Sequence, residues 1–261
     1  MAALDISITD GVATITLARS EIHNAFDDVL IANLTAAFNE VGGDGAVRAV
    51  ILASEGKSFS AGADLNWMRR MASYSEAENL ADAKALAELM QAIDTCPKPT
   101  IARVQGAAFG GGVGLVACCD IAVASERASF CLSEVKLGIV PAVIGPYIVR
   151  AIGPRAARRY VQTAERFGAA EAHRLGLVHE VAAEDALDAV IAGIVDALRQ
   201  GGPEAHREAK SLVALVADRD PADVSEETAG SIAKIRASTE GQEGLSAFLE
   251  KRPPAWVRDK G

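Results

Sequence analysis

Three consecutive glycines, Gly110–Gly112, stand between a strand-like segment and a helix-like segment and constrain the fold more than any other feature. Glycine has no Cβ, so its backbone can bend sharply and its N–H groups can approach a ligand closely. At a helix N-terminus such N–H groups have no partner inside the helix and carry partial positive charge. The segment therefore predicts a backbone cradle for a negatively charged oxygen.

Two further segments belong to this candidate site. The turn Ala61–Asp64 (AGAD) is a second loop-to-helix junction, so each junction can present one N–H to the same oxygen, although Asp64 also suits a simple helix N-terminus. Glu134 is the only acid in FCLSEVKLGIVP. It is either a surface carboxylate paired with Lys136 or a desolvated acid or base with a raised pKa. A cradle beside a carboxylate favours enolate or oxyanion chemistry.

The glycines allow two other interpretations. Gly112, Gly114 and Ala117 match the G-x-G-x-x-A fingerprint of dinucleotide-binding oxidoreductases. The next strand follows too soon for a βαβ crossover, which needs a dozen or more residues. Alternatively, the glycines serve only the close packing of a helix.

Composition excludes several classes of protein. A net charge of −9 disfavours a nucleic-acid groove. The cysteines (96, 118, 119 and 131) form no C-x-x-C pair and the four histidines have no metal-binding spacing, so we expect reduced thiols and no metal site. No apolar run is long enough to span a bilayer, and the start MAALDISITD does not read as a secretory signal. We expect a cytoplasmic protein without membrane or nucleic-acid partners.

Apolar periodicity predicts alternating strands and helices over the first 200 of the 261 residues. Leu4–Thr9 and Val12–Leu17 alternate around Asp10-Gly11, which predicts a hairpin. Asn24 is the expected cap of a helix over 27–41, and the loop 57–64 is expected to become helical at Leu65. The other expected strands are 47–53, 100–104, 119–124 and 177–181, and the other expected helices are 76–95, 142–152, 155–163, 169–175 and 187–198.

Beyond Gly201-Gly202-Pro203 the strand pattern stops, and three helices are expected up to about residue 248. The pattern predicts an α/β fold with a core over 1–200 and a helical region over 201–261.

Together these segments resemble the crotonase family, the enoyl-CoA hydratases and isomerases. The resemblance covers nearly the whole chain and rests on RSEIHNAF, SFSAGADL, VQGAAFGGGVGL, CDIAVAS, LSEVKLGIVP, LGLVHEV and EGLSAFLEKRPPAW. Within the family, AAFGG, CCDIA, CLSEV and AERF resemble the bacterial methylglutaconyl-CoA hydratase-like branch of leucine and isoprenoid degradation.

The resemblance implies a spiral of ββα units and a C-terminal helical region that forms a homotrimer, often a dimer of trimers. It implies that Ala63 and Gly111 donate their N–H groups to the thioester carbonyl, with Glu134 as catalytic acid or base. The implied substrate-binding residues are His23, Ala61, Asp64 and Leu65 near the CoA adenine, Trp67, Met68 and Met71 along the acyl chain, and Gly110 and Gly114 beside the cradle. CoA is part of the acyl-CoA substrate, so no separate cofactor is implied.

One departure from the family pattern concerns the acid–base residues. Hydratases of this family commonly hold one water between two glutamates; the second maps onto Glu134, but the first maps onto Gly114, which has no proton-transfer group. We expect hydration of a 2-enoyl-CoA, branched or carboxylated, with Glu134 as the sole carboxylate. Arg69 and Arg70 are either partners of a carboxylated chain or solvated. A Δ3,Δ2-enoyl-CoA isomerase and a non-catalytic acyl-CoA binder are the alternatives.

Overall fold

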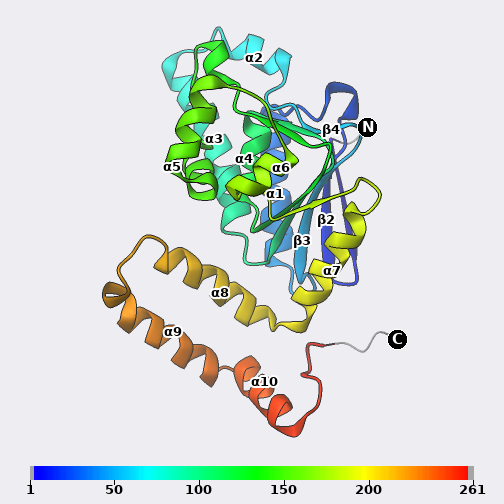
Figure 1. The fold of residues 1–261 in the computed structure, drawn as a ribbon, viewed down its shortest axis with the longest axis vertical. Coiled ribbons are helices and arrows are strands. Elements are labelled where there is room, and N and C mark those ends of the chain that lie inside the picture. Colours follow the sequence, from blue (N-terminus) through cyan, green and yellow to red (C-terminus); the bar gives the residue numbers. More distant parts are fainter. Residues whose placement is uncertain (1–2, 258–261) are drawn as a thin grey trace.

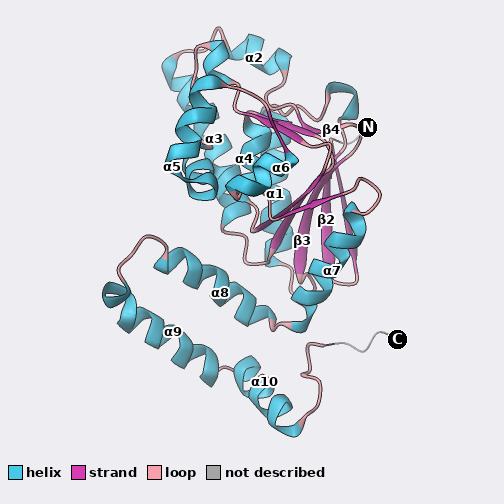
Figure 2. Cartoon of the chain, viewed as in Figure 1, coloured by secondary structure: helices cyan, strands magenta, loops and turns pink. Residues whose placement is uncertain are grey.

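The computed structural model describes residues 3–257 and contains two β-sheets flanked by helices (Figures 1 and 2). The larger sheet has the strand order β1-β2-β3-β5-β7-β10, in which β1 is antiparallel to β2 and the other neighbours are parallel. Its strands are Leu4–Thr9 (β1), Val12–Leu17 (β2), Ala49–Ser54 (β3), Thr100–Val104 (β5), Ile121–Ser125 (β7) and Glu180–Ala182 (β10).

The smaller sheet has the order β4-β6-β8-β9, and its first three strands are parallel. These strands are Ser58–Ser60 (β4), Ala107–Phe109 (β6), Ser129–Cys131 (β8) and Phe167–Gly168 (β9). The chain thus repeats one unit three times: β3, β5 and β7 each enter the larger sheet, β4, β6 and β8 each follow into the smaller sheet, and helices come next. This is the spiral of ββα units that the family resemblance implies.

Ten α-helices and three 3-10 helices complete the described residues. The α-helices are Asp28–Gly43 (α1), Leu65–Met71 (α2), Glu76–Asp94 (α3), Gly111–Cys118 (α4), Gly145–Thr163 (α5), Ala169–Leu175 (α6), Leu187–Gln200 (α7), Pro203–Val216 (α8), Ser225–Ala237 (α9) and Thr239–Glu250 (α10). The 3-10 helices are Ser20–Ile22 (η1), Glu134–Leu137 (η2) and Pro221–Val224 (η3). None of the helices in the described part of the chain is long and apolar enough to cross a membrane.

Apolar burial joins the sheets to most of the helices. The main core contains Ile15 of β2, Leu34 of α1 and Leu89 of α3, together with Val113 of α4. A smaller cluster forms where Ile191 and its neighbours on α7 pack against β5 and β7. In contrast, α8 and α9 bury none of their side chains and lie apart from the sheets in Figure 1. The core of this chain therefore contributes little to the stability of α8 and α9.

Several predicted elements are confirmed. The hairpin has the expected register, and Asp10 and Gly11 both have positive φ (50° and 76°), as the tight hairpin turn requires. Helix α2 begins at Leu65, and α3 and α7 begin where predicted. The expected break near residue 153 appears as a kink in α5, where Gly153 has a φ of 72°.

Other predictions are wrong at element boundaries. Strands β3, β7 and β10 begin at Ala49, Ile121 and Glu180, later than the expected 47, 119 and 177. The strands of the smaller sheet were not expected at all, because segments of two or three residues are too short to show a period of two.

Asn24 does not cap α1. Asp27 is the cap, since its carboxylate accepts the N–H of Leu30 at 2.9 Å. Asn24 is instead fully buried with a positive φ of 54°, and its amide donates to the carbonyl oxygens of Glu55 (2.8 Å) and Ser58 (2.9 Å). It thereby ties the chain before α1 to the start of β4.

Replacing Asn24 with alanine should destabilise the protein by about 3 kcal/mol. The carbonyl of Glu55 loses its donor, the N–H of Arg19 loses its acceptor, and alanine must keep a left-handed backbone. Urea denaturation measures this loss. The matched control is Asn33→Ala on the exposed face of α1, which should change stability by less than about 0.5 kcal/mol. Equal stability of the two variants would contradict the role given to Asn24.

Candidate active site

The two predicted turns meet at one edge of the smaller sheet. Strands β4 and β6 are parallel neighbours, and the turns that follow them, Ala61–Asp64 and Gly110–Gly112, leave the sheet side by side. A methyl group added at Gly62 would lie 2.8 Å from the carbonyl oxygen of Phe109 and 3.7 Å from the nitrogen of Gly111. The structure therefore brings the two turns into contact.

The backbone N–H of Ala63 is available for a ligand. Phe26 donates its N–H to the carbonyl of Gly62 at 2.8 Å and accepts the N–H of Asp64 at 2.9 Å. This parallel bridge uses the groups on either side of Ala63, so the N–H of Ala63 itself points away from Phe26. It has no hydrogen-bond partner among residues 3–257.

The N–H of Gly111 is available for a different reason. Gly111 is the first residue of α4, so its N–H has no acceptor inside the helix. The turn before it is fixed by Gly110, which has a φ of 51° and donates its N–H to the carbonyl of Cys131 at 2.8 Å. Within the described chain the N–H of Gly111 has no partner, and the dipole of α4 adds positive potential there.

Glu134 faces this glycine turn. A methyl group added at Gly110 would lie 3.3 Å from Oε1 of Glu134. Oε2 of the same carboxylate is buried and accepts no hydrogen bond from any described residue. Burial raises the pKa of Glu134 above its ordinary value of 4.5.

The pairing of Glu134 with Lys136 is absent from the described structure, because the Lys136 ammonium donates to the carbonyl of Ala164 at 2.7 Å. Of the two interpretations of Glu134, the structure therefore supports the desolvated one. Two free N–H groups beside a desolvated carboxyl can stabilise a growing oxyanion and exchange a proton with the atoms next to it.

Four residues that the resemblance implies near the CoA adenine lie around the end of β4. His23 has its ring nitrogen Nδ1 3.1 Å from the hydroxyl of Ser58, and its carbonyl accepts the N–H of Ala61 at 2.9 Å. Asp64 is buried and caps α2 by accepting the N–H groups of Asn66 and Trp67, at 2.8 and 3.0 Å. Ala61 and Leu65 are exposed on either side of it.

Helix α2 carries the residues predicted along the acyl chain. Trp67 is buried and donates its indole N–H to Asp82 at 3.0 Å, whereas Met68 and Met71 are half-buried. Arg69 donates to the side chain of Asn66 at 2.6 Å, and Arg70 forms an ion pair with Asp28 at 2.5 Å. Both arginines are exposed, as expected for the solvated interpretation.

Gly114 lies on α4 against a neighbouring side chain. A methyl group added there would lie 2.2 Å from Cγ2 of Ile144 and 3.3 Å from the sulfur of Met90. Ile144 is itself buried, with 2% of its surface exposed. Position 114, onto which the family resemblance maps the first glutamate of two-carboxylate hydratases, is therefore closed here by an apolar side chain.

Sequence reasoning missed two residues that hold the site together, Phe26 and Ser60. The hydroxyl of Ser60 donates to the carbonyl of Asn24 at 2.9 Å and accepts the N–H of Gly62 at 3.2 Å. Phe26 lies in the HNAF segment, which by itself gives this residue no role. Both act through contacts between distant segments, which leave no local pattern in the sequence.

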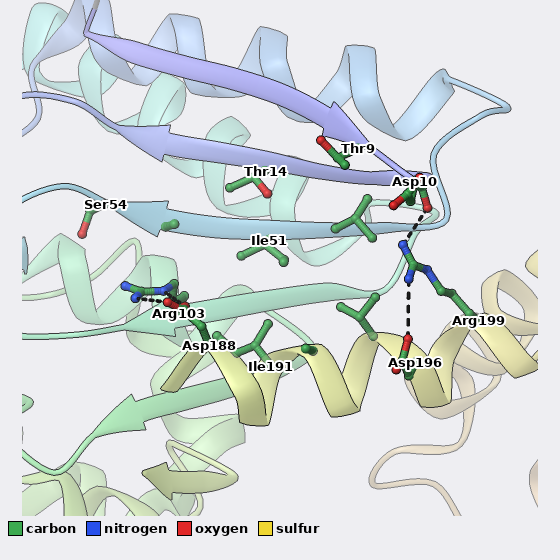
Figure 3. A pocket seen from close by; sticks show the side chains of 14 residues that line it. Thr9, Asp10, Thr14, Ile51, Ser54, Arg103, Asp188, Ile191, Asp196 and Arg199 are labelled. Atoms are coloured by element: carbon green, nitrogen blue, oxygen red, sulfur yellow. Dashed lines mark hydrogen bonds and ion pairs between the residues drawn. The ribbon is translucent and has the colours of Figure 1, made fainter. Parts of the chain in front are cut away.

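A separate groove of about 510 Å³ lies between the larger sheet and α7 (Figure 3). Its charged groups pair with one another: Arg103 binds Asp188 at 2.6 and 3.1 Å, and Arg199 lies 3.5 Å from Asp196. Arg199 also donates to the backbone carbonyl of Asp10 at 2.8 Å. Its lining residues include neither the two turns nor Glu134. In residues 3–257 no three His, Cys, Asp or Glu side chains converge as a metal site would require. The chemistry is therefore assigned to the turns.

Comparison with known proteins gives a consistent result. The family model for enoyl-CoA hydratase/isomerase matches residues 7–259. A crotonyl-CoA hydratase of Syntrophomonas wolfei is 32% identical over 249 residues, which cover 94% of each chain. An enoyl-CoA hydratase from Shewanella pealeana has a crystal structure that superposes with a TM-score of 0.95 at 49% identity, over 98% of this chain and 96% of the other. One from Mycobacterium smegmatis superposes with a TM-score of 0.93 at 35% identity, over 99% and 100%.

Glu134→Gln should stabilise the fold at high pH only. Because the pKa of Glu134 lies above 4.5 in the folded protein, the unfolded chain ionises this group first. Stability therefore falls as pH rises from 4.5 to the raised pKa, stays lower above it, and carries no such cost below 4.5. The variant should melt at a higher temperature than the wild type at pH 8, and at the same temperature as the wild type at pH 4. Differential scanning calorimetry tests this against Glu126→Gln, an exposed carboxylate whose loss should be neutral at both pH values.

Proposed function

Because the chain belongs to the enoyl-CoA hydratase/isomerase family, we propose that it adds water to the double bond of a 2-enoyl-CoA thioester. The observation that carries the proposal is the pair of unpartnered N–H groups, of Ala63 and Gly111, beside the buried carboxyl of Glu134. The reverse reaction, dehydration, follows from the same groups.

In this mechanism the thioester carbonyl oxygen accepts both N–H groups. As water adds to C3, negative charge moves onto this oxygen, where the two donors stabilise it as an enolate. Removing one oxyanion donor typically costs roughly 3–4 kcal/mol of the barrier. Glu134 takes a proton from the attacking water and then delivers a proton to C2, so that H and OH are added overall.

Glu134 performs both proton transfers because Gly114 offers no second carboxyl and Ile144 fills the space beside it. Burial raises the pKa of Glu134, and a raised pKa makes its carboxylate a better base for the proton that it must take and then return.

The same Gly114 motivates a second candidate, a Δ3,Δ2-enoyl-CoA isomerase. In that reaction Glu134 removes a proton from C2 of a 3-enoyl thioester and returns it to C4, and no water is needed. A non-catalytic acyl-CoA binder is the third candidate. It would keep the two N–H donors but lack turnover.

For the substrate, we propose that the CoA adenine lies near His23, Ala61, Asp64 and Leu65. The acyl chain runs along Trp67 and Met68 toward the turn that contains Gly110. A carboxylated chain such as that of methylglutaconyl-CoA needs a cation. Since Arg69 and Arg70 already contact Asn66 and Asp28, one of them must exchange partners to bind it.

For assembly, we propose a homotrimer formed through the helical region 201–261. Phe248 and Leu249 on α10 are 81% and 78% exposed, and Ile232 on α9 is 46% exposed. Such surface is costly to leave in water and is typical of a protein–protein contact. Pairs of trimers are a further possible state of the same assembly.

Purified protein should hydrate crotonyl-CoA and methylglutaconyl-CoA, seen as loss of the absorbance of the conjugated thioester, and should leave a 3-enoyl-CoA unchanged. Glu134→Gln should lower kcat by about 10²–10⁴-fold, the usual contribution of a general acid–base group. As base, Glu134 must be ionised, so kcat/KM for hydration should fall as pH drops through its raised pKa.

Glu126→Gln is the matched control and should keep wild-type kcat. If the protein converts only the 3-enoyl-CoA, the proposed reaction is isomerisation and not hydration. Tight CoA binding without turnover of any substrate would favour the non-catalytic binder.

Phe248→Glu should dissociate the assembly, because a charge then replaces an apolar contact between copies. Sedimentation equilibrium should give three or six chain masses for the wild type and one for the variant. Val29→Glu on α1, also at an exposed apolar position, should leave the mass unchanged. A monomeric wild type would refute the trimer.

A further inference from the structure

We propose that Phe26 is a positioning residue that sets the spacing and direction of the two oxyanion donors. It contacts both donor segments at once, through its backbone on one side and its ring on the other. The inference rests on the proposed function, in which Ala63 and Gly111 bind the thioester oxygen.

The backbone of Phe26 aims the first donor. Its N–H and C=O bind Gly62 and Asp64, at 2.8 and 2.9 Å, and leave Ala63 between them with its N–H directed away. Gly62 has a φ of 86°, so this turn needs an external partner to hold it in one conformation. Phe26 supplies that partner from the segment before α1.

The ring of Phe26 supports the second donor. A methyl group added at Gly111 would lie 2.2 Å from Cζ of the ring and 3.2 Å from Cε1 and Cε2, so the tip of the ring rests on the glycine. The ring is 2% exposed. Its centroid lies 6.4 Å from that of Trp67, which is in turn hydrogen-bonded to Asp82. The ring therefore has little freedom to withdraw from Gly111.

Spacing matters because an oxyanion donor acts only at about 2.7–3.1 Å from the oxygen. A misplacement of about 1 Å can cost roughly 100-fold in rate. Ala63 and Gly111 belong to different ββα units, and Phe26 belongs to neither. A residue that touches both units from outside can fix their separation.

The test compares Phe26→Leu with Phe38→Leu, an equally buried phenylalanine on α1 in the same core. Both variants lose ring volume, but only the first withdraws the support of Gly111. We expect Phe26→Leu to lower kcat for crotonyl-CoA hydration at least about 10-fold while KM changes less than about 3-fold. Phe38→Leu should keep wild-type kcat.

A spectroscopic readout separates positioning from stability. Butyryl-CoA labelled with ¹³C at the carbonyl has no double bond to hydrate, and its C=O stretch in difference infrared spectra reports hydrogen bonding to the oxygen. Binding to the wild type should lower this frequency, and Phe26→Leu should move it back toward the free value. Phe26→Met, which retains more volume and flexibility, should also move the carbonyl frequency toward the free value. This variant provides the test if Phe26→Leu does not fold.

The inference is overturned if both Phe26 variants keep the wild-type kcat and the wild-type carbonyl frequency of bound butyryl-CoA. It is also overturned if these two quantities change no more in the Phe26 variants than in Phe38→Leu. If the wild type itself neither lowers the carbonyl frequency nor hydrates crotonyl-CoA, the proposed function fails first. That failure is read from the wild type alone and is distinct from a failure of Phe26.

Discussion

The close approach of β4 and β6 is the constraint on which the candidate site depends. A methyl group at Gly106 would lie 2.0 Å from the carbonyl oxygen of Lys57, and one at Gly112 would lie 2.7 Å from that of Ser60. The neighbouring backbone therefore excludes a side chain at both of these glycines. Gly111 stands between them as the first residue of α4, where its N–H has no acceptor inside the helix. Close packing and an anion cradle, which compete as interpretations of the sequence, are thus two consequences of one arrangement.

Burial raises the pKa of several titratable groups near this core, but the buried groups differ in their roles. It raises the pKa of the Cys118 and Cys119 thiols, which then behave as small apolar groups and contact Met90 and the carbonyl of Leu115. It also raises the pKa of Glu134, but this carboxyl faces the glycine turn with one oxygen unpartnered. A group that is costly to bury and lacks a structural partner is a strong candidate for chemistry.

The predictable parts of the molecule are those specified by adjacent residues. The Asp10-Gly11 hairpin and the start of α2 at Leu65 follow from turn and cap chemistry within a few positions. The turns that contain Ala63 and Gly111 were each predicted from local residues. That both serve one oxygen was a hypothesis from the same residues, and the family resemblance made it specific. Contacts between distant segments were not predictable. Asn24 was predicted to cap α1 but binds the carbonyls of Glu55 and Ser58 instead. The packing of Phe26 on Gly111 leaves no periodic pattern in the sequence. The short strands of the smaller sheet were missed for a related reason. They are defined by hydrogen bonds to neighbouring strands and not by the β-propensity of their own two or three residues.

The packing of Ile144 against Gly114 bears on the geometry of the proposed reaction. Because this side chain occupies the place of a second carboxyl, the glycine is matched to its surroundings, and restoring a glutamate would require the isoleucine to move. One carboxyl must then reach both the attacking water at C3 and the carbon C2. Two atoms served by a single planar group lie on the same side of the double bond, so H and OH must be added to one face. Within the proposed reaction, reliance on the single carboxyl of Glu134 therefore predicts syn addition of water.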